Sequence, residues 1–404
     1  MSTVEQADAL HAQAAALNKE GRFAGAAAFD ACLRLLTRSP EANVYYAKYR
    51  AAMLEADGQA AADVGAIATR LAEAAAAAPV RTGCRLGPGV RERAVAAVVA
   101  AAVSDAAAMP LHWVYDLSKL KVLVGDGPAA FVSPAADAFY SYPVGSASPY
   151  GEQAAALLRS LVDARGFSPE AYAVSTFATF GAPGHSGYID ASTAGFLRAV
   201  RAGVDWPACG AEDAQANCVA RLPPLVALLA GDAQLLPAVA QMVRVTQATD
   251  NAVAYGCAGA RILEGVILGA DPAEAVQRAI TALRDPLRAF PLEGDGVVAD
   301  ALDAAVALAG ASHADAVAQL GRNCHLPGAL ASPVHACLNT LPSLEAAVAA
   351  TILQGGCNAS RASFVGAVFG AARGLEGIPQ EWRAKHTDYE KTLALADTVL
   401  SLRD

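Results

Sequence analysis

Hydrophobic positions recur with the period of a helix along most of the chain. From Ala7 to Arg38 apolar residues return every three or four positions, and Gly21 interrupts them where a turn would join two helices. Two further helical segments follow, at Val44–Ala56 and at Gln59–Ala78, on either side of an Asp-Gly turn. These patterns predict two helical pairs within residues 1–80, which would share a core by stacking on one another.

A change in composition marks a boundary after this region. Residues 81–91 contain three glycines and one proline, which is typical of a linker. Beyond it, alanine-rich helical patterns continue to the end of the chain, and strand-like runs are limited to short candidates such as Lys121–Val124. The sequence therefore predicts an all-α protein with a helical region at 1–80, a linker at 81–91 and a larger multi-helix bundle at 92–404.

The first 80 residues resemble tetratricopeptide repeats over about two repeats. The resemblance rests on a Gly-Arg-Phe turn at 21–23, on Pro40 and on the run YRAAMLEADGQAAAD that follows. It implies that residues 1–80 hold a protein partner. The alternative is a plain helical extension with no partner of its own.

Composition and charge exclude several classes of protein. Hydrophobic residues make up 54% of the 404 residues and charged residues 17%, so the chain is not a disordered one. Thirty Lys and Arg against 39 Asp and Glu give a net charge of −9, which argues against nucleic-acid binding. The eight cysteines are scattered without a CxxC pair, and the N-terminus lacks the pattern of a targeting signal. We expect a cytoplasmic protein with reduced thiols and no membrane association.

Two polar stretches interrupt the apolar pattern of the larger domain. Asp105 lies in a small-residue helical run that continues toward His112, and a buried carboxylate there requires a partner. Tyr150 and Glu152 stand where a loop rich in Ser, Pro and Gly leads into a helix. Both acids have plain structural interpretations, because Asp105 could bond nearby backbone and Glu152 could simply favour a helix start.

A third stretch places a polar cluster at the start of a helix near the C-terminus. Gly355 and Gly356 form a turn that leads into Asn358, Ser360 and Arg361. Free N–H groups at a helix start favour anions, so the cluster is a candidate site for a phosphate or a ribose. The glycines lack the following Lys of a P-loop.

Together these stretches resemble the ADP-ribosylglycohydrolase family over about residues 92–385. The family's opening Gly-Asp-Ala-Leu-Gly helix is matched at residues 104–108, and its closing Gly-Gly-Asp-x-Asp-Thr helix start at residues 355–360. The run 217–223, which contains Arg221, resembles the family's Asn-Gly-x-x-Met-Arg-x-x-Pro stretch. The runs HWVYD at 112–116 and YGEQ at 150–153 place the resemblance in the J1-crystallin-like branch, named for lens proteins of jellyfish.

The family resemblance implies a hydrolase that removes ADP-ribose, or a related nucleotide-ribose, with two Mg²⁺ ions held by Thr-Asp-Asp and Asp-x-Asp-Thr stretches. Mg²⁺ prefers carboxylate and other oxygen ligands. In this chain the corresponding positions keep only one carboxylate, and they fall at Tyr150, Gly151, Glu152, Cys357, Ala359 and Ser360. We therefore expect no metal cofactor, although Mg²⁺ is what the resemblance alone would imply.

Without metals, the sequence leaves several interpretations of the pocket open. In the first, Gly355, Gly356, Asn358, Ser360 and Arg361 bind an ADP-ribose-like molecule or substrate, and glycoside cleavage would use carboxyl groups. The candidate acids and bases are Asp105, Glu152 and His112, and Arg221 and Tyr150 would also contact the ligand.

Other interpretations of the pocket also remain open. Arg361 and Glu152 could pair across an inert pocket, and Arg221 could form a structural ion pair. Cys357 as a nucleophile stands last, because no His lies near it in the sequence. The alternative from a different class is a non-catalytic structural or scaffold protein, which a pocket filled by Tyr150 or Phe364 would favour.

Overall fold

Helices are the regular elements throughout the part of the chain that the computed structural model describes, namely residues 64–75, 79–82, 86–136, 142–182, 185, 187–338 and 342–403. In these residues, β-pairing is limited to isolated bridges. The predicted all-α class is confirmed. The short strand candidate was wrong, because Lys121–Val124 ends helix α6 (Leu117–Val124), whose first N–H groups are capped by the Asp116 side chain.

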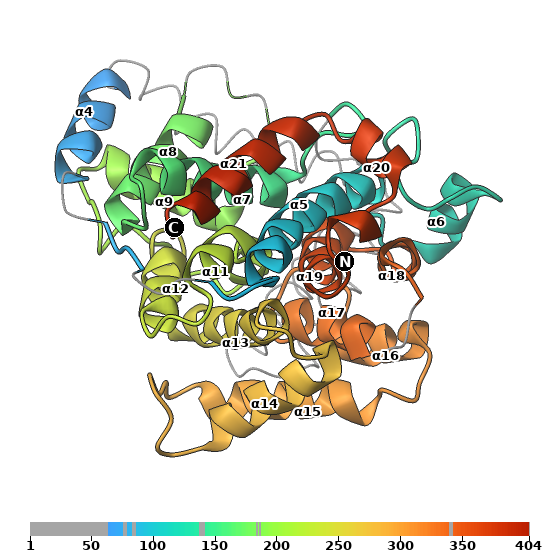
Figure 1. The fold of residues 1–404 in the computed structure, drawn as a ribbon. Helices are drawn as coiled ribbons and strands as arrows, with labels where there is room; N and C mark the ends of the chain where they lie inside the picture. Colours follow the sequence, from blue (N-terminus) through green and yellow to red (C-terminus); the bar gives the residue numbers. More distant parts are fainter. Residues whose placement is uncertain are drawn as a thin grey trace, which may run out of the picture.

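The helices follow one another with short connections (Figure 1). The first half of the described chain contains α4 (Val64–Ala74), α5 (Val90–Ala108), α6, α7 (Pro149–Asp163), α8 (Pro169–Phe180), α9 (Ala191–Arg201), α10 (Asn217–Ala220), α11 (Pro223–Leu229) and α12 (Leu235–Arg244). The second half contains α13 (Asp250–Ile267), α14 (Pro272–Arg284), α15 (Asp295–Ala307), α16 (His313–Leu320), α17 (Gly328–Leu338), α18 (Leu344–Ile352), α19 (Asn358–Arg373), α20 (Gln380–Lys385) and α21 (Tyr389–Ser401).

Helices α5 and α19 form the centre of the bundle and share its most extensive contact. Their close approach depends on glycines of α19. A Cβ at Gly366 would lie 2.6 Å from the carbonyl oxygen of Ala100, and one at Gly370 would lie 2.5 Å from that of Ala96. Since real Cβ atoms do not approach so closely, the glycines set the interhelical distance. The two stretches that carry Asp105 and the Gly-Gly turn are thereby held together.

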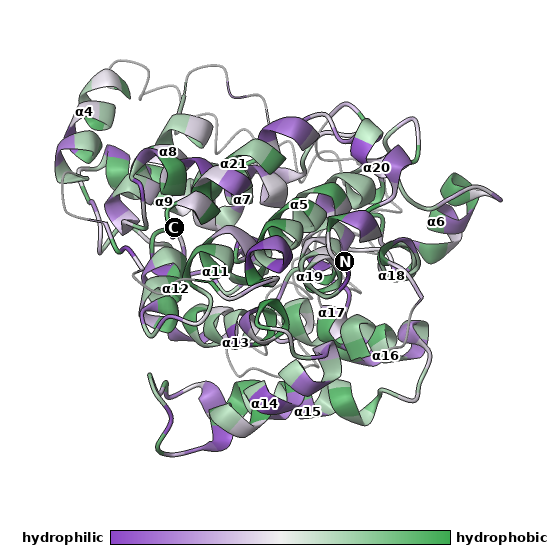
Figure 2. Ribbon diagram, viewed as in Figure 1, coloured by the Kyte–Doolittle hydropathy of each residue, from purple (hydrophilic) through white to green (hydrophobic). Residues whose placement is uncertain are grey.

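Burial explains why α5 is apolar all round rather than amphipathic. The segment Val90–Leu111 is long and apolar enough to cross a membrane, with a mean hydropathy of 1.8, but 94% of it is buried inside the protein. Figure 2 shows the contrast with outer helices such as α14 and α15, which alternate hydrophobic and hydrophilic residues. The composition of α5 is therefore that of a core helix.

The predicted tetratricopeptide-like region lies almost wholly outside the described residues. Its described part is α4, which falls inside the expected helix at 59–78 and packs against α8. Arg70 of α4 donates to Asp205 at 2.9 Å and to the carbonyl oxygen of Val200. The boundary at residues 81–91 is an expectation that nothing here tests, although α5 begins at Val90.

Candidate functional site

The Gly-Gly turn before α19 is the point where the three polar stretches meet. Gly355 and Gly356 both have positive φ values, 64° and 65°, which favour glycine. The turn pairs with the chain after α5, because the Trp113 N–H donates to the Gly356 carbonyl at 2.8 Å and the Gly356 N–H donates to Val114 at 2.9 Å. The sequence pattern predicted this turn, and the structure shows which segments lie beside it.

The N–H groups of the turn are already used within the protein. Those of Gly355 and Gly356 donate to Ile352 and Val114, both at 2.9 Å. Those of the next two residues donate to the carbonyls of Arg322 and Gly356, both at 2.8 Å. The expectation that this backbone receives a phosphate stays a prediction, which would require each of these donors to leave a protein acceptor first.

Arg361 also points into the protein. Its side chain is fully buried, and the guanidinium donates to the carbonyl oxygens of Arg322 and Gly355, both at 2.5 Å. The hydroxyl of Tyr142 donates to the Glu152 carboxylate at 2.8 Å. Arg361 and Glu152 thus bind different partners, and the Arg361 side chain holds the turn in place through its two hydrogen bonds.

The Cys357 sulfur lies at the centre of a buried polar cluster. Its distances are 3.5 Å to His112 Nε2, 3.4 Å to the Tyr150 hydroxyl and 3.1 Å to Ser360 Oγ. His112 is 245 positions away in the sequence. No His lies near Cys357 in the sequence, but the fold brings His112 to the thiol.

The cluster changes the pKa values of its members. Burial acts to raise the pKa of Cys357, but hydrogen bonds from Cys324, His112 and Ser360 together hold it well below its usual value. The hydrogen bond with Cys357 and burial raise the pKa of the Cys324 thiol. Burial lowers the pKa of His112, which keeps this imidazole neutral at pH 7.

Asp105 and Glu152 lie on the other side of the site, on α5 and α7. Asp105 is buried and accepts from the Ser148 N–H at 2.7 Å and from its hydroxyl at 2.5 Å. Burial raises the pKa of Asp105 to about 7 and the pKa of Glu152, which is half-buried, also to about 7. Two neighbouring carboxyl groups that titrate near neutrality are suited to proton transfer.

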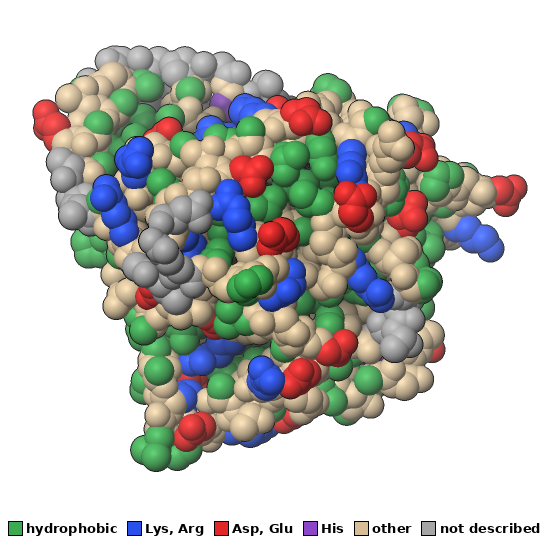
Figure 3. All heavy atoms as spheres, viewed as in Figure 1, with side chains coloured by type: hydrophobic (Ala, Val, Ile, Leu, Met, Phe, Trp, Pro, Cys, Tyr) green, Lys and Arg blue, Asp and Glu red, His purple; other side chains and the backbone are tan. Residues whose placement is uncertain are grey.

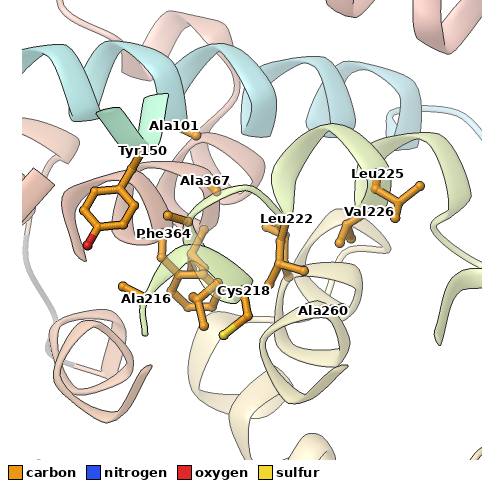
Figure 4. Packing of buried hydrophobic residues seen from close by; sticks show 14 of the residues in the cluster. Ala101, Tyr150, Ala216, Cys218, Leu222, Leu225, Val226, Ala260, Phe364 and Ala367 are labelled. Atoms are coloured by element: carbon orange, nitrogen blue, oxygen red, sulfur yellow. The ribbon is translucent and has the colours of Figure 1, made fainter. Parts of the chain in front are cut away.

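The two aromatic side chains that could fill the pocket lie in different surroundings, and only Tyr150 contacts Cys357. Tyr150 and Phe364 are both buried, and Phe364 points from α19 toward Cys218 and Leu222 (Figure 4). Behind Asp105, a cavity of about 50 Å³ is lined mainly by aliphatic residues of α5, α7 and α11, and by the imidazole of His386. That volume suits a few water molecules rather than a nucleotide.

The remaining polar residues form a buried network beside α7. The Gln153 amide donates to Asp190 at 2.7 Å and accepts from Asn217 at 3.1 Å. Arg221 is fully buried and donates to neutral oxygens, among them Gln247 Oε1 at 3.2 Å and the Val243 carbonyl at 3.0 Å. The predicted ion pair of Arg221 was wrong, and its side chain holds the neighbouring backbone in place.

Several site residues escaped the sequence reasoning. Ser148 and Tyr142 hold the two carboxyl groups, and no motif singled them out. Trp113 is half-buried, with a positive φ of 62°, and it stacks on His112 with ring centroids 4.1 Å apart. Tyr188 meets Trp113 edge-on at 4.7 Å. The non-glycine left-handed backbone at Trp113 is a signal that only a structure gives.

The residues present do not fit a pair of Mg²⁺ ions. Across the described residues, no group of three or more His, Cys, Asp or Glu side chains is placed to hold an ion. A Cβ at Gly151 would lie 2.9 Å from Asp105 Cγ and 2.9 Å from the Ala147 Cβ, so a carboxylate has no room there. Cys357 offers a thiol, which is a poor ligand for Mg²⁺. No step of a reaction is therefore derived through a metal.

The arrangement of the helices defines a bundle of the ADP-ribosylglycohydrolase type. The chain matches the ADP-ribosylglycohydrolase family over residues 86–404 and belongs to that family. A solved "ADP-ribosylglycohydrolase-related protein complex" shares the fold with a TM-score of 0.59 at 23% identity, over 78% of this chain and 99% of that one.

Two curated relatives narrow the resemblance. Crystallin J1A of Tripedalia cystophora is 33% identical over 72% of this chain and 91% of its own length. Crystallin J1B of the same animal is 30% identical over 78% of this chain and 98% of its own length. The expected likeness to J1-crystallins is confirmed.

Proposed function

We propose that this chain is a non-hydrolytic member of the family with a structural role. One observation carries the proposal: the positions where family members would hold two Mg²⁺ ions are closed by the protein's own groups. Cys357 Sγ contacts Tyr150, His112 and Ser360, and the Asp105 carboxyl occupies the space that a side chain at Gly151 would need. Without the metals, the family's route to an activated water is lost.

The state of the Gly-Gly turn supports the same proposal. Its N–H groups and the Arg361 guanidinium stabilise the protein itself, so a phosphate would have to displace existing hydrogen bonds. Each buried carbonyl that lost its donor would cost about 1 to 3 kcal/mol. The names of the two relatives, both crystallins, favour a role that depends on packing rather than on turnover.

A second candidate function is the binding of an ADP-ribose-like ligand at the carboxyl side of the site. Glu152 is half-buried and accepts from the half-buried Tyr142, and the partly exposed rings of Trp113 and Tyr188 pack against each other beside His112. Aromatic rings stack on nucleobases, and two carboxyl groups with pKa values near 7 could act as acid and base. The chemistry would then be metal-independent.

Thermal unfolding with ADP-ribose separates the two candidates. A ligand at about a hundred times its Kd adds about 2.7 kcal/mol of stability, which raises the Tm measurably. The structural proposal expects no rise in Tm with ADP-ribose, either with or without Mg²⁺. A rise without Mg²⁺ that Glu152→Gln abolishes would favour the second candidate, and a rise that requires Mg²⁺ would overturn both.

A hydrolysis assay completes the test. ADP-ribosylated peptides carrying the modification on Ser or on Arg are incubated with the protein, and released ADP-ribose is measured by chromatography. The structural proposal expects no release above that of the heat-denatured protein. Release by the wild type that persists in chelator and is lost in Asp105→Asn would contradict the proposal.

A further inference from the structure

The described cysteines fall into two groups by what their sulfur atoms contact. Cys209, Cys218 and Cys257 each face a backbone carbonyl oxygen, at distances of 3.3 to 3.8 Å. Burial raises the pKa of Cys218 and of Cys257 to about 12, and it also raises that of Cys337. These thiols donate to acceptors or lie in apolar surroundings, so they remain protonated and unreactive.

Cys357 belongs to the other group, because its sulfur is surrounded by groups that can donate to it. The Cys357 thiol donates to the Tyr150 hydroxyl at 3.4 Å, and this hydroxyl can turn to donate once the thiol is ionised. His112 Nε2 and Ser360 Oγ also lie within hydrogen-bonding distance of the sulfur. The Cys324 thiol forms a further hydrogen bond with Cys357. Donors to sulfur stabilise the thiolate, which is the nucleophilic form of cysteine.

The two thiols approach because their backbones are neighbours. The Cys357 N–H donates at 2.8 Å to the carbonyl of Arg322, two residues before Cys324. The Cys324 carbonyl in turn accepts from the Ala216 N–H at 2.7 Å, which fixes the loop from its other side. A bond between the sulfur atoms would therefore join segments that already lie side by side.

We propose that Cys324 and Cys357 form a redox modification site, in which a small peroxide converts the thiol pair into a reversible disulfide. Cys324 is the more accessible partner, since 8% of it is exposed and Cys357 is fully buried. Among the described cysteines Cys324 is also the most exposed, the others having at most 5%. Hydrogen peroxide is small enough to reach the pair past Cys324. This site goes beyond the proposed structural role and does not depend on it.

The reaction balances with peroxide as the oxidant. The Cys357 sulfur attacks one peroxide oxygen, the O–O bond breaks, and a sulfenic acid forms while the other oxygen leaves as water. The Cys324 sulfur then attacks the sulfenic sulfur, the S–O bond breaks and a second water leaves. Two S–H bonds are replaced by one S–S bond, so the thiols lose two electrons and peroxide gains them. A dithiol reverses the change by exchange.

The test uses the full-length chain with Cys32 and Cys84 replaced by serine, because those two cysteines lie outside the described residues. The protein is treated with hydrogen peroxide, its remaining thiols are alkylated in denaturant, and peptides are mapped by mass spectrometry with and without dithiothreitol. We expect one intramolecular linked peptide pair that contains Cys324 and Cys357, a mass loss of two hydrogens and complete recovery in dithiothreitol.

Matched variants make the assignment specific. Cys324→Ser should leave a sulfenic acid at Cys357, detectable with dimedone, and no linked peptide. The double variant Cys218→Ser, Cys257→Ser removes the other pair of neighbouring thiols and should form the Cys324–Cys357 link like its parent. Retention of both thiols in the parent protein under peroxide excess, or a link between other cysteines, would overturn the proposal whatever the variants do.

Discussion

The two sides of the site differ in how they limit their negative charge. On the α19 side, the acidic residues are absent, and Cys357, Ala359 and Arg361 are enclosed by neighbouring groups. On the side of α5 and α7, the acids Asp105 and Glu152 remain, with pKa values of about 7. The first side has no carboxyl group at Cys357, Ala359 or Arg361, and the second holds its carboxyl groups close to the protonated state.

This difference teaches that a site can limit its negative charge in two physical ways, with different consequences for the protein. The enclosed side becomes part of the core, and its polar groups stabilise the fold. The carboxyl side stays titratable, so it links stability to pH. Substitutions on the two sides should therefore report through different measurements, folding free energy for the first and pH dependence for the second.

The largest expected change in the free energy of unfolding follows removal of the buried Arg361 guanidinium, on the enclosed α19 side. Arg361→Ala leaves the carbonyls of Arg322 and Gly355 without these donors and opens a cavity beside the turn. We expect a loss of about 4 kcal/mol in the free energy of unfolding, measured by urea titration. Arg278→Ala, on an exposed face of α14, is the control and should change it by less than about 0.5 kcal/mol.

The opposite result for Arg361 would break the comparison. If Arg361→Ala unfolds at the same urea concentration as the wild type but no longer responds to ADP-ribose, the guanidinium serves a ligand. The turn would then open in solution, and the two sides would form one binding pocket.

A smaller change in the free energy of unfolding is expected when the pH is varied, through the side of the site that holds Asp105 and Glu152. Burial raises the pKa of Asp105 from 3.8 to about 7. Between these values the folded protein keeps a proton that the unfolded chain releases, so stability falls as the pH rises through this window. From about pH 5 to pH 8 we expect the unfolding free energy to drop by about 2 to 3 kcal/mol through this group.

The control for the pH effect is the neutral analogue. Asp105→Asn should flatten the decline between pH 5 and pH 8, whereas Asp126→Asn, at an exposed position, should follow the wild type. An unchanged pH profile in Asp105→Asn would mean that this carboxyl is ionised at neutral pH in the folded protein, and the contrast between the sides would disappear.

The sequence predicted the helical class and the positions of the polar stretches, because both depend on local patterns. The spacing of Gly366 and Gly370 is of the same local kind, and their partners on α5, Ala100 and Ala96, are small residues. What each polar group contacts could not be predicted. The meeting of His112 with Cys357 and the use of Arg361 by backbone carbonyls depend on segments far apart in the chain. The helical period of apolar residues shows which face of a helix is buried. It does not show which hydrogen-bonding group of another segment lies opposite that face.

The smallest predicted effect compares two tyrosines, one on each side of the site. Tyr150 is buried and accepts from the Cys357 thiol at 3.4 Å, whereas Tyr142 is half-buried and donates to Glu152 Oε2 at 2.8 Å. Removal of either hydroxyl leaves the ring in place. Tyr150→Phe should lower the unfolding free energy by about 1 kcal/mol, and Tyr142→Phe by a smaller amount because water can replace a partly exposed donor.

The two substitutions should differ more clearly in what they titrate. Because the Tyr142 hydroxyl lowers the pKa of Glu152, Tyr142→Phe should raise that pKa above its value of about 7 and leave the reactivity of Cys357 unchanged. Tyr150→Phe should slow the oxidation of Cys357 and leave Glu152 unchanged, since it removes the hydroxyl beside the sulfur, which could turn to stabilise the thiolate. Carboxyl carbon NMR of Glu152 and peroxide-dependent thiol loss measure the two effects. A shift of both readouts in both variants would show that the two sides act as one electrostatic unit.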